Sequence, residues 1–340
     1  MEQESLKESI SLLNSFINSI HFSDPQAYRD LIIFPLYSDM VKDNGYMLLD
    51  EALQTEKFRI QEISDGGSVP ELTVTNELDS DVLLLEGDIL VGAKQNRTVN
   101  TTIIVGKGSK LVIPVSCVEQ GRWRYKTRGF RSSKFTVDPD IRKMKAKTVS
   151  QSLRHSRQFR ADQGGVWNTI SEKMRRHNYY SESMDVDELY ESRQDSFQDY
   201  ERSFSYKDQQ IGIAVFNGNE LSGCDIFGVK GIMYKTFKKI ISGYIFEGIE
   251  KSYWLRGKRE SLDFALLKGK LDNFLKSLHS LSKEVFKSVG EGNDIRFDSP
   301  EITGYAIEHN SKIVHIAGFY YPEAEQGPYF RNRRWRGEEP

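Results

Sequence analysis

Between positions 31 and 126, strand-like runs alternate with turns about every ten residues, and this spacing limits the fold more than any other sequence feature. The runs rich in apolar residues include LIIFPLY at 31–37, ELTVTNE at 71–77, DVLLLEG at 81–87 and KLVIPVSCVE at 110–119. Pro35 has no amide hydrogen for a neighbouring strand, so the first run is predicted at a sheet edge or a bulge. The region as a whole is typical of a β-barrel or β-sandwich.

Helical patterns dominate the middle of the chain. Asp138 precedes Pro139, a residue suited to the first turn of a helix, and residues 138–205 are predicted to form several helices, with an acidic one at 182–201. Strands return at 210–228, where Asn217-Gly218 favours a hairpin. Two helices at about 230–249 and 260–288 and a last hairpin at 302–321 follow from their apolar periodicity.

The order of these elements is β, α, β, α, β, which disfavours a doubly wound parallel sheet. No linker rich in Pro, Gly or Ser divides the chain. We therefore predict an α+β fold with a β-rich barrel- or sandwich-like core and packed helices, in a single integrated unit over residues 1–340. Its three parts are an N-terminal β-rich part at about 31–126, a helical insert at about 138–205 and a C-terminal α+β part at about 208–320.

Composition excludes several classes of protein. Charged residues make up 28% and hydrophobic residues 38% of the chain, a profile of globular rather than disordered proteins. The first residues lack the apolar segment of a signal peptide, and no apolar run reaches the roughly 18 residues of a membrane span. The two cysteines, Cys117 and Cys224, do not form a C-x-x-C motif. We predict a reduced, cytoplasmic protein without a membrane or disulfide framework.

Neither a metal nor a nucleic acid is expected as a partner. The six histidines lack the spacing of metal sites, so we predict no metal centre. Residues 122–160 contain 13 Lys or Arg against two Asp, with aromatic residues between them, which is compatible with nucleic-acid binding. The acidic helix at 182–201 offers the same charges an intramolecular partner. We predict that the two regions pack together and largely neutralise each other.

The segment GAKQNRTVN at 92–100 places polar side chains between two of the most apolar stretches of the chain. Strands rarely bury such groups unless the groups satisfy each other or a ligand. One interpretation is a structural network in which Arg97 pairs with Glu119 or Glu86. The other is a ligand pocket in which Arg97 and Lys94 bind an anion, and Gln95 and Asn96 provide donors and acceptors.

The ligand-pocket interpretation also assigns roles to neighbouring residues. Glu86, Asp88 and Glu119 are the candidate acids or bases, and Arg122 and Trp123 complete the ligand-binding set. Cys117 lies in an apolar strand without a neighbouring base in sequence, so we predict that it is buried and unreactive. The residue pattern alone does not decide between pocket and network.

Several longer motifs together resemble one known family. They are YMLLDEAL, SVPELTVTNE, LLLEGDILVGAKQNR, NTTIIV, IPVSCVEQGRW, DQGGVW and GCDIFG, followed by SGYIFEGI. Over residues 30–320 the chain is similar to the ADP-ribosylglycohydrolase- and rhodanese-phosphatase-associated domain family. The resemblance implies a context in NAD or ADP-ribose metabolism and a nucleotide or ADP-ribose-like ligand. It does not assign a reaction, and the cofactor stays unknown.

Four functions remain open at this point. The protein could be a hydrolase that uses Glu86, Asp88 or Glu119 as acid or base, or a binding module without catalysis. It could instead be a structural or interaction protein whose motif residues form an internal network. A cupin-like binder of sugars or metabolites is the fourth, although the metal-binding histidines of cupins are missing from the sequence.

Overall fold

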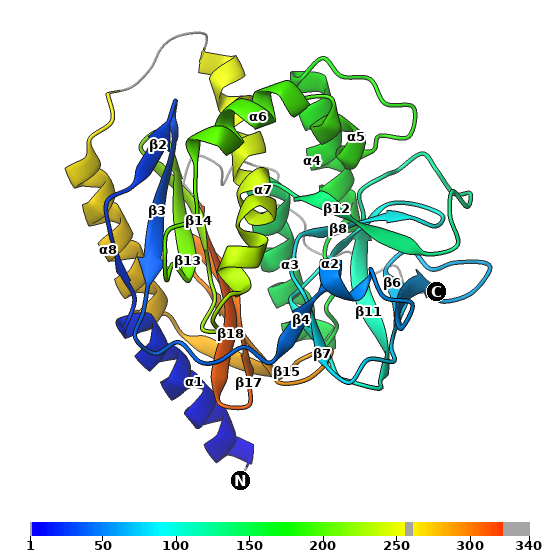
Figure 1. Cartoon of the computed structure of the whole chain (residues 1–340), viewed down its shortest axis with the longest axis horizontal. Coiled ribbons are helices and arrows are strands. Elements are labelled where there is room, and N and C mark those ends of the chain that lie inside the picture. The colour runs from blue at the N-terminus through cyan, green and yellow to red at the C-terminus, as the bar shows by residue number, and fades with distance from the viewer. Residues whose placement is uncertain (1, 256–260, 322–340) are drawn as a thin grey trace.

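The computed structural model describes residues 2–255 and 261–321, which form an α+β fold that includes a curled half-barrel sheet (Figure 1). The α+β prediction is therefore confirmed. Three sheets and the helices around them make up the described part of the chain. No helix within it is both long and apolar enough to cross a membrane.

The largest sheet has nine strands and joins the two ends of the chain. Its order is β1-β3-β13-β14-β18-β17-β16-β15, with β2 also paired to β3, and all its pairs are antiparallel. The strands are β1 (His21–Phe22), β2 (Gln26–Tyr28), β3 (Leu31–Tyr37), β13 (Gly212–Asn217), β14 (Glu220–Ile226), β15 (Lys283–Lys287), β16 (Asn293–Asp298), β17 (Ile302–His309) and β18 (Lys312–Tyr320). The run at 31–37 thus pairs with β13 and does not continue into the strands that follow it.

Pro35 lies at a local gap in this sheet. One side of β3 pairs with β13 along its length, including Pro35 opposite Ile213. On the other side, β2 covers residues 31–33 and β1 covers residues 36–37. The proline falls between these two short strands, where its missing amide hydrogen breaks no pair.

Helices cover both faces of the nine-stranded sheet (Figure 1). Along β3, Ile32, Phe34 and Leu36 pack on the outer face with α1 (Glu2–Asn18) and α8 (Phe264–Ser280). Leu31 and Ile33 point to the inner face, toward α3 (Pro139–Ser156) and α7 (Ile232–Leu255). The alternation of side chains along a strand explains how a continuously apolar run feeds two hydrophobic cores.

The two smaller sheets are built from the middle of the N-terminal half. The six-stranded sheet has the order β12-β8-β9-β11-β6-β5, and the three-stranded sheet has the order β10-β7-β4. Their strands are β4 (Tyr46–Leu48), β5 (Phe58–Glu62), β6 (Glu71–Asn76), β7 (Asp81–Leu84), β8 (Asp88–Gly92), β9 (Arg97–Val99), β10 (Ile103–Val105), β11 (Lys110–Cys117) and β12 (Phe130–Thr136). The short helix α2 (Leu49–Ala52) follows β4. These sheets share a third hydrophobic core.

The first helix after β12 begins where the sequence predicts, but one of the predicted helices is in fact two separate helices. Asp138 caps α3 by accepting a hydrogen bond from the Asp140 amide at 3.0 Å, and Pro139 is its first residue. Next comes α4 (Gln163–Arg176). The single acidic helix predicted at 182–201 is two helices, α5 (Val186–Glu191) and α6 (Gln194–Ser203).

The helix predicted at 260–288 is too long at its C-terminal end. It ends at Ser280, and residues 283–287 form β15 instead. Leu281 already has extended dihedral angles, and β15 pairs with β16 along its five residues. The first residue of that predicted helix, residue 260, lies outside the described residues.

Candidate functional site

The family-like motif GAKQNR forms a tight turn from β8 into β9. Gly92 has φ of +135°, and a Cβ there would lie 2.5 Å from Thr127 Oγ1 and 2.6 Å from the Gly129 carbonyl oxygen. Only glycine fits at this position. Asn96 closes the turn, because its Oδ1 accepts a hydrogen bond from the Gly92 amide at 2.9 Å.

A pair formed by Glu119 and Arg122 holds the same turn from outside. Arg122 Nε and Nη2 donate to the two carboxylate oxygens of Glu119 at 2.7 and 2.6 Å. The remaining donors of Arg122 reach the carbonyl oxygens of Ala93 and Gly92 at 2.6 and 3.2 Å. Glu119 Oε2 also accepts the Asn96 amide hydrogen at 2.9 Å. These two residues therefore support the backbone of the motif.

The predicted pairing of Arg97 with Glu119 or Glu86 is wrong. Glu119 binds Arg122, and Glu86 binds Arg142 at 2.8 Å and Lys145 at 2.9 Å. Arg97 instead has an ion pair with Glu62 of β5 at 3.8 Å. The curl of the six-stranded sheet brings this partner close, because its two edge strands β5 and β12 contact each other, a neighbourhood that no local pattern reveals.

Glu86 and Asp88, two of the candidate acids, are buried in other ion pairs. Asp88 binds Lys239 of α7 at 2.8 Å. Burial nonetheless raises the pKa of Asp88, and Lys239 opposes that shift. Neither residue lines the two pockets described below. Both carboxylates therefore form ion pairs in the core, and neither is placed to contact a ligand in these pockets.

Cys117 is buried at the end of β11. Burial raises the pKa of its thiol to about 11, against the opposing effect of Arg97, so the thiol stays protonated at neutral pH. Gln163 of the DQGGVW motif fixes this strand end, since its amide group accepts from the Cys117 amide at 2.7 Å and donates to the Cys117 carbonyl oxygen at 2.9 Å. Gln163 thus binds the strand end much as a neighbouring strand would.

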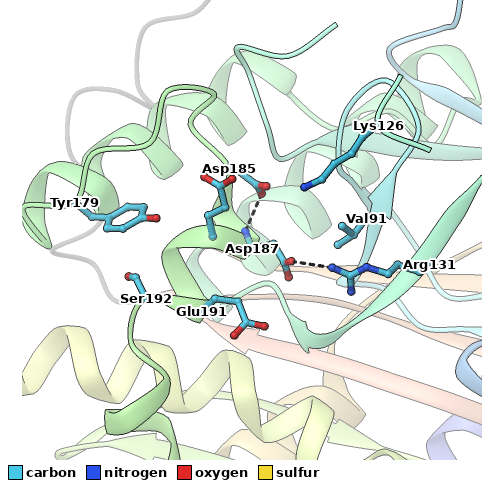
Figure 2. A pocket seen from close by; sticks show the side chains of 9 residues that line it. Val91, Lys126, Arg131, Tyr179, Asp185, Asp187, Glu191 and Ser192 are labelled. Carbon is cyan, nitrogen blue, oxygen red and sulfur yellow. Dashed lines mark hydrogen bonds and ion pairs between the residues drawn. The ribbon is translucent and has the colours of Figure 1, made fainter. Parts of the chain in front are cut away.

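An open pocket of about 390 Å³ lies beside the GAKQNR turn (Figure 2). Its carboxylates come from α5 and the residue that caps it, and its cations from the loop before β12 and from β12 itself. Figure 2 shows Lys126 and Arg131 across the pocket from Asp185 and Asp187. The lining residues are Val91, Lys126, Arg131, Tyr179, Asp185, Asp187, Glu188, Glu191 and Ser192.

Asp185 connects this pocket to the motif. Its Oδ2 accepts a hydrogen bond from Asn96 Nδ2 at 2.8 Å, and its Oδ1 caps α5 by accepting from the Asp187 amide at 2.9 Å. Burial, followed by repulsion from Glu119, raises the pKa of Asp185 from 3.8 to about 7. At neutral pH this carboxyl group is therefore close to half protonated.

The other charges of the pocket are partly paired. Asp187 accepts a hydrogen bond from Ser133 Oγ and lies 4.0 Å from Arg131 Nη2. Lys134 and Glu191 form a neighbouring ion pair at 3.0 Å. These contacts join the basic segment to the acidic one, as predicted. The two segments do not largely neutralise each other, however, because five other cations of the basic segment bind carboxylates elsewhere, namely Arg122, Arg142, Lys143, Lys145 and Arg154.

None of the nine residues chosen from the sequence lines the pocket directly. Asn96 and Glu119 act on it through Asp185, and Arg122 acts through Glu119. Sequence reasoning missed Asp185 and Asp187 because they belong to a run that reads as an acidic, solvated helix. The available signal was the MDVDELY segment, in which an aspartate precedes an apolar helical start as an N-cap does.

A second pocket of about 460 Å³ lies between α3, α7, the end of α4 and the β13–β14 hairpin. Two of its carboxylates, Asp140 and Glu250, bind Lys173 at 2.7 Å each. Glu247 accepts a hydrogen bond from Ser222 at 2.6 Å, and burial raises its pKa to about 7. This pocket has no contact with the GAKQNR turn, which favours the first pocket as the candidate site.

One known protein family matches most of this chain. Residues 19–319 match the ARG and Rhodanese-Phosphatase-superfamily-associated Protein domain, ARPP-1. The chain belongs to this family. Comparisons with the curated proteins and with the solved structures give no match.

The ARPP-1 match contains the GAKQNR turn, the Glu119–Arg122 pair and the whole first pocket. It also contains strands of all three sheets, so it covers the structural core and not a single motif. Within residues 2–255 and 261–321, no group of three His, Cys, Asp or Glu side chains is arranged to hold a metal ion.

Proposed function

We propose that the first pocket binds a nucleotide or ADP-ribose-like ligand through its ribose and phosphate groups. The observation that carries this proposal is Asp185, a buried carboxyl with a pKa of about 7 that faces the pocket and is bound to the motif residue Asn96. Carboxylates accept hydrogen bonds from ribose hydroxyls, and the cations Lys126 and Arg131 suit phosphate oxygens.

The chemistry available to Asp185 is proton transfer. A group with a pKa near the working pH is present in both forms and can donate or accept a proton. In a glycosidic hydrolysis, the protonated form would give its proton to the leaving oxygen at the ribose. Glu119 contributes by raising the pKa of Asp185, and Asn96 and Arg122 position the two groups.

The family name supports this choice of ligand. Its abbreviation ARG refers to ADP-ribosylglycohydrolase, and we place the protein in NAD or ADP-ribose metabolism on that basis. We further propose a cytoplasmic location. Cys117 and Cys224 are both free thiols, which fits a reducing compartment.

Thermal-shift and calorimetric titrations with ADP-ribose, NAD, ADP and ribose 5-phosphate test this function. A ligand at 100 times its Kd should stabilise the protein by about 2.7 kcal/mol. Asp185→Asn and Arg131→Met should each lose most of the affinity. Arg128→Met, an exposed change in the same basic segment, is the matched control and should bind like the parent. A panel without any response would contradict the proposal.

A structural or interaction protein without catalysis is the second candidate. The observation that favours it is the mutual satisfaction of Asn96, Glu119 and Arg122, which bind one another and the turn backbone. Incubation of the parent protein with the best ligand of the panel separates the two. Ligand breakdown that Asp185→Asn abolishes favours an enzyme, and intact ligand favours a binding or structural protein.

A further inference from the structure

One edge of the Arg97 guanidinium group has no hydrogen-bond partner. The side chain is 0% exposed, and its Nη1 donates to Gln95 Oε1 at 3.2 Å. Its Nε and Nη2 atoms are buried and have no hydrogen-bond acceptor. These two nitrogens form the side of the planar fork that binds two oxygens of one anion.

Glu62 adds an unused acceptor beside this edge. Its Oε1 lies 3.8 Å from Arg97 Nη2 and accepts the Lys94 amide hydrogen at 3.2 Å. Its Oε2 is buried and has no donor. The same small region therefore holds two unused donors and one unused acceptor, and buried polar groups without partners are costly.

We call this region the Arg97 compartment and define it by Glu62, Gly67, Lys94, Arg97 and Trp123. A Cβ added to Gly67 would lie 3.2 Å from both Lys94 Cδ and Trp123 Cζ2 and 3.4 Å from Glu62 Oε2, so this glycine forms the cover. The Arg97 guanidinium lies 5.6 Å from the Trp123 ring centre, and that ring is 45% exposed.

The charges in the compartment leave a positive excess. Arg97 and Lys94 carry two positive charges and Glu62 one negative charge. Lys94 Nζ donates to the Gly66 carbonyl oxygen at 2.9 Å and lies over the Trp123 and Tyr125 rings, so it forms no ion pair with Glu62. Burial lowers the pKa of Arg97, which indicates that the charge is undercompensated.

We propose that the Arg97 compartment binds phosphate, with two phosphate oxygens on Arg97 Nε and Nη2 and a phosphate hydroxyl donating to Glu62 Oε2. The unused atoms define this ligand class, because it must offer acceptors to the arginine and a donor to the glutamate. Inorganic phosphate keeps a hydroxyl at neutral pH, and a phosphate monoester keeps one below its second pKa of about 6, whereas sulfate has none. The inference does not rest on the function of the Asp185 pocket.

Calorimetric titration of the full chain with inorganic phosphate, methyl phosphate and sulfate tests the proposal. Phosphate should bind at least ten times more tightly than sulfate, since only phosphate can donate to Glu62. Binding of inorganic phosphate alone supports a free anion as the natural ligand, and binding of methyl phosphate as well, at a pH below about 6 where its monoanion keeps the hydroxyl, supports a terminal phosphate. Equal binding of phosphate and sulfate, or binding of neither, overturns the proposal and leaves solvent as the occupant.

Two variants test the two side chains that are proposed to bind the anion. Arg97→Lys keeps the charge but loses the planar edge, and should weaken phosphate binding at least tenfold. Glu62→Gln replaces the acceptor by a group that can also donate, and should abolish or reverse the preference over sulfate. The controls are Arg59→Lys on β5, where Arg59 is exposed, and Glu71→Gln on β6. If Arg97→Lys does not fold, the relative affinity of Glu62→Gln for phosphate and sulfate still tests the proposal.

None of the three anions contains a ribose, so failure of the ADP-ribose panel leaves this test intact. Conversely, a lost preference for phosphate over sulfate in Glu62→Gln with an unchanged ADP-ribose response would support two separate sites. Phosphate binding that Glu62→Gln and Arg97→Lys leave unchanged would place the anion elsewhere and overturn the proposal.

Discussion

The protonation of single residues depends on which side chains lie against them. Asp185 receives hydrogen bonds from Asn96 and from the Asp187 amide, which favour its charged form. Burial and the nearby Glu119 carboxylate outweigh them and raise the pKa. Asp225, equally buried, has its pKa held far below the usual range by Arg142. The contrast shows that a paired cation, more than depth, decides the outcome.

The raised pKa of Asp185 predicts how stability depends on pH. The unfolded carboxyl ionises near 3.8 and the folded one near 7, so the folded state holds the extra proton between these values. The free energy of unfolding contributed by this residue therefore falls as the pH rises from about 4 to about 7 and then levels off. Asp185→Asn removes this fall.

Urea unfolding of the parent and Asp185→Asn at pH 5 and pH 8 measures the effect. The parent should lose on the order of 2 kcal/mol relative to the variant between these two pH values. Asp199→Asn, an exposed change on α6, should follow the parent. A constant difference between parent and Asp185→Asn would show that the Asp185 pKa is not raised.

Cys117 yields a second prediction at the residue scale. Its thiol is buried and has a pKa of about 11, so the reactive thiolate is scarce at neutral pH. Iodoacetamide should label Cys117 no faster than the protein unfolds, as followed by mass spectrometry with and without urea. Rapid labelling in the folded state would indicate an accessible thiolate and an activated nucleophile.

At the scale of elements, the sequence predicts what local patterns encode. The Asp138-Pro139 helix start, the Asn217-Gly218 hairpin and the last hairpin follow from the identity of a few adjacent residues. The strand β12 was missed, because its FRSSKFT sequence is polar and its burial does not alternate strictly. Its pairing with β8, about 40 residues earlier, makes it a strand.

Local sequence patterns also predicted only part of the candidate site. The GAKQNR segment could be identified as exceptional, since polar residues interrupt two apolar strands. The partners could not, because Asn96 meets Asp185 across 89 positions and Arg97 meets Glu62 across a sheet whose order the sequence does not state. Prediction therefore located the motif residues but assigned Arg97 the wrong carboxylate.

The support of the GAKQNR turn by Arg122 can be tested at this scale. Arg122→Ala would leave the buried Glu119 carboxylate without its cation and remove one of the two donors to the Ala93 carbonyl oxygen. We expect a loss of about 3 kcal/mol in the free energy of unfolding. The neighbouring Arg124→Ala is the control, since Arg124 is exposed. Chemical unfolding that does not distinguish the two variants would contradict the supporting role.

At the scale of the whole molecule, one buried network links the sheets. Arg142 of α3 binds Glu86, beside the six-stranded sheet, at 2.8 Å and Asp225 of the nine-stranded sheet at 2.6 Å. Asp225 also accepts hydrogen bonds from Tyr244 and His315. One helix thus carries a cation that both sheets share, which explains why the chain should behave as the single unit that the sequence predicts.

Arg142→Met tests this linkage. The change leaves Asp225 and part of Glu86 buried without their cation, and should cost about 3–5 kcal/mol while unfolding remains a single transition. The control is Arg154→Met on the same helix. Arg154 also binds two carboxylates, Glu284 and Asp298, but is 39% exposed, so about 0–1 kcal/mol is expected. Urea unfolding is followed by tryptophan fluorescence and far-UV circular dichroism. If the fluorescence and circular-dichroism curves coincide in each variant, the chain unfolds as one cooperative unit. Separate midpoints for the two signals in Arg142→Met would show that the sheets unfold independently once this arginine is lost.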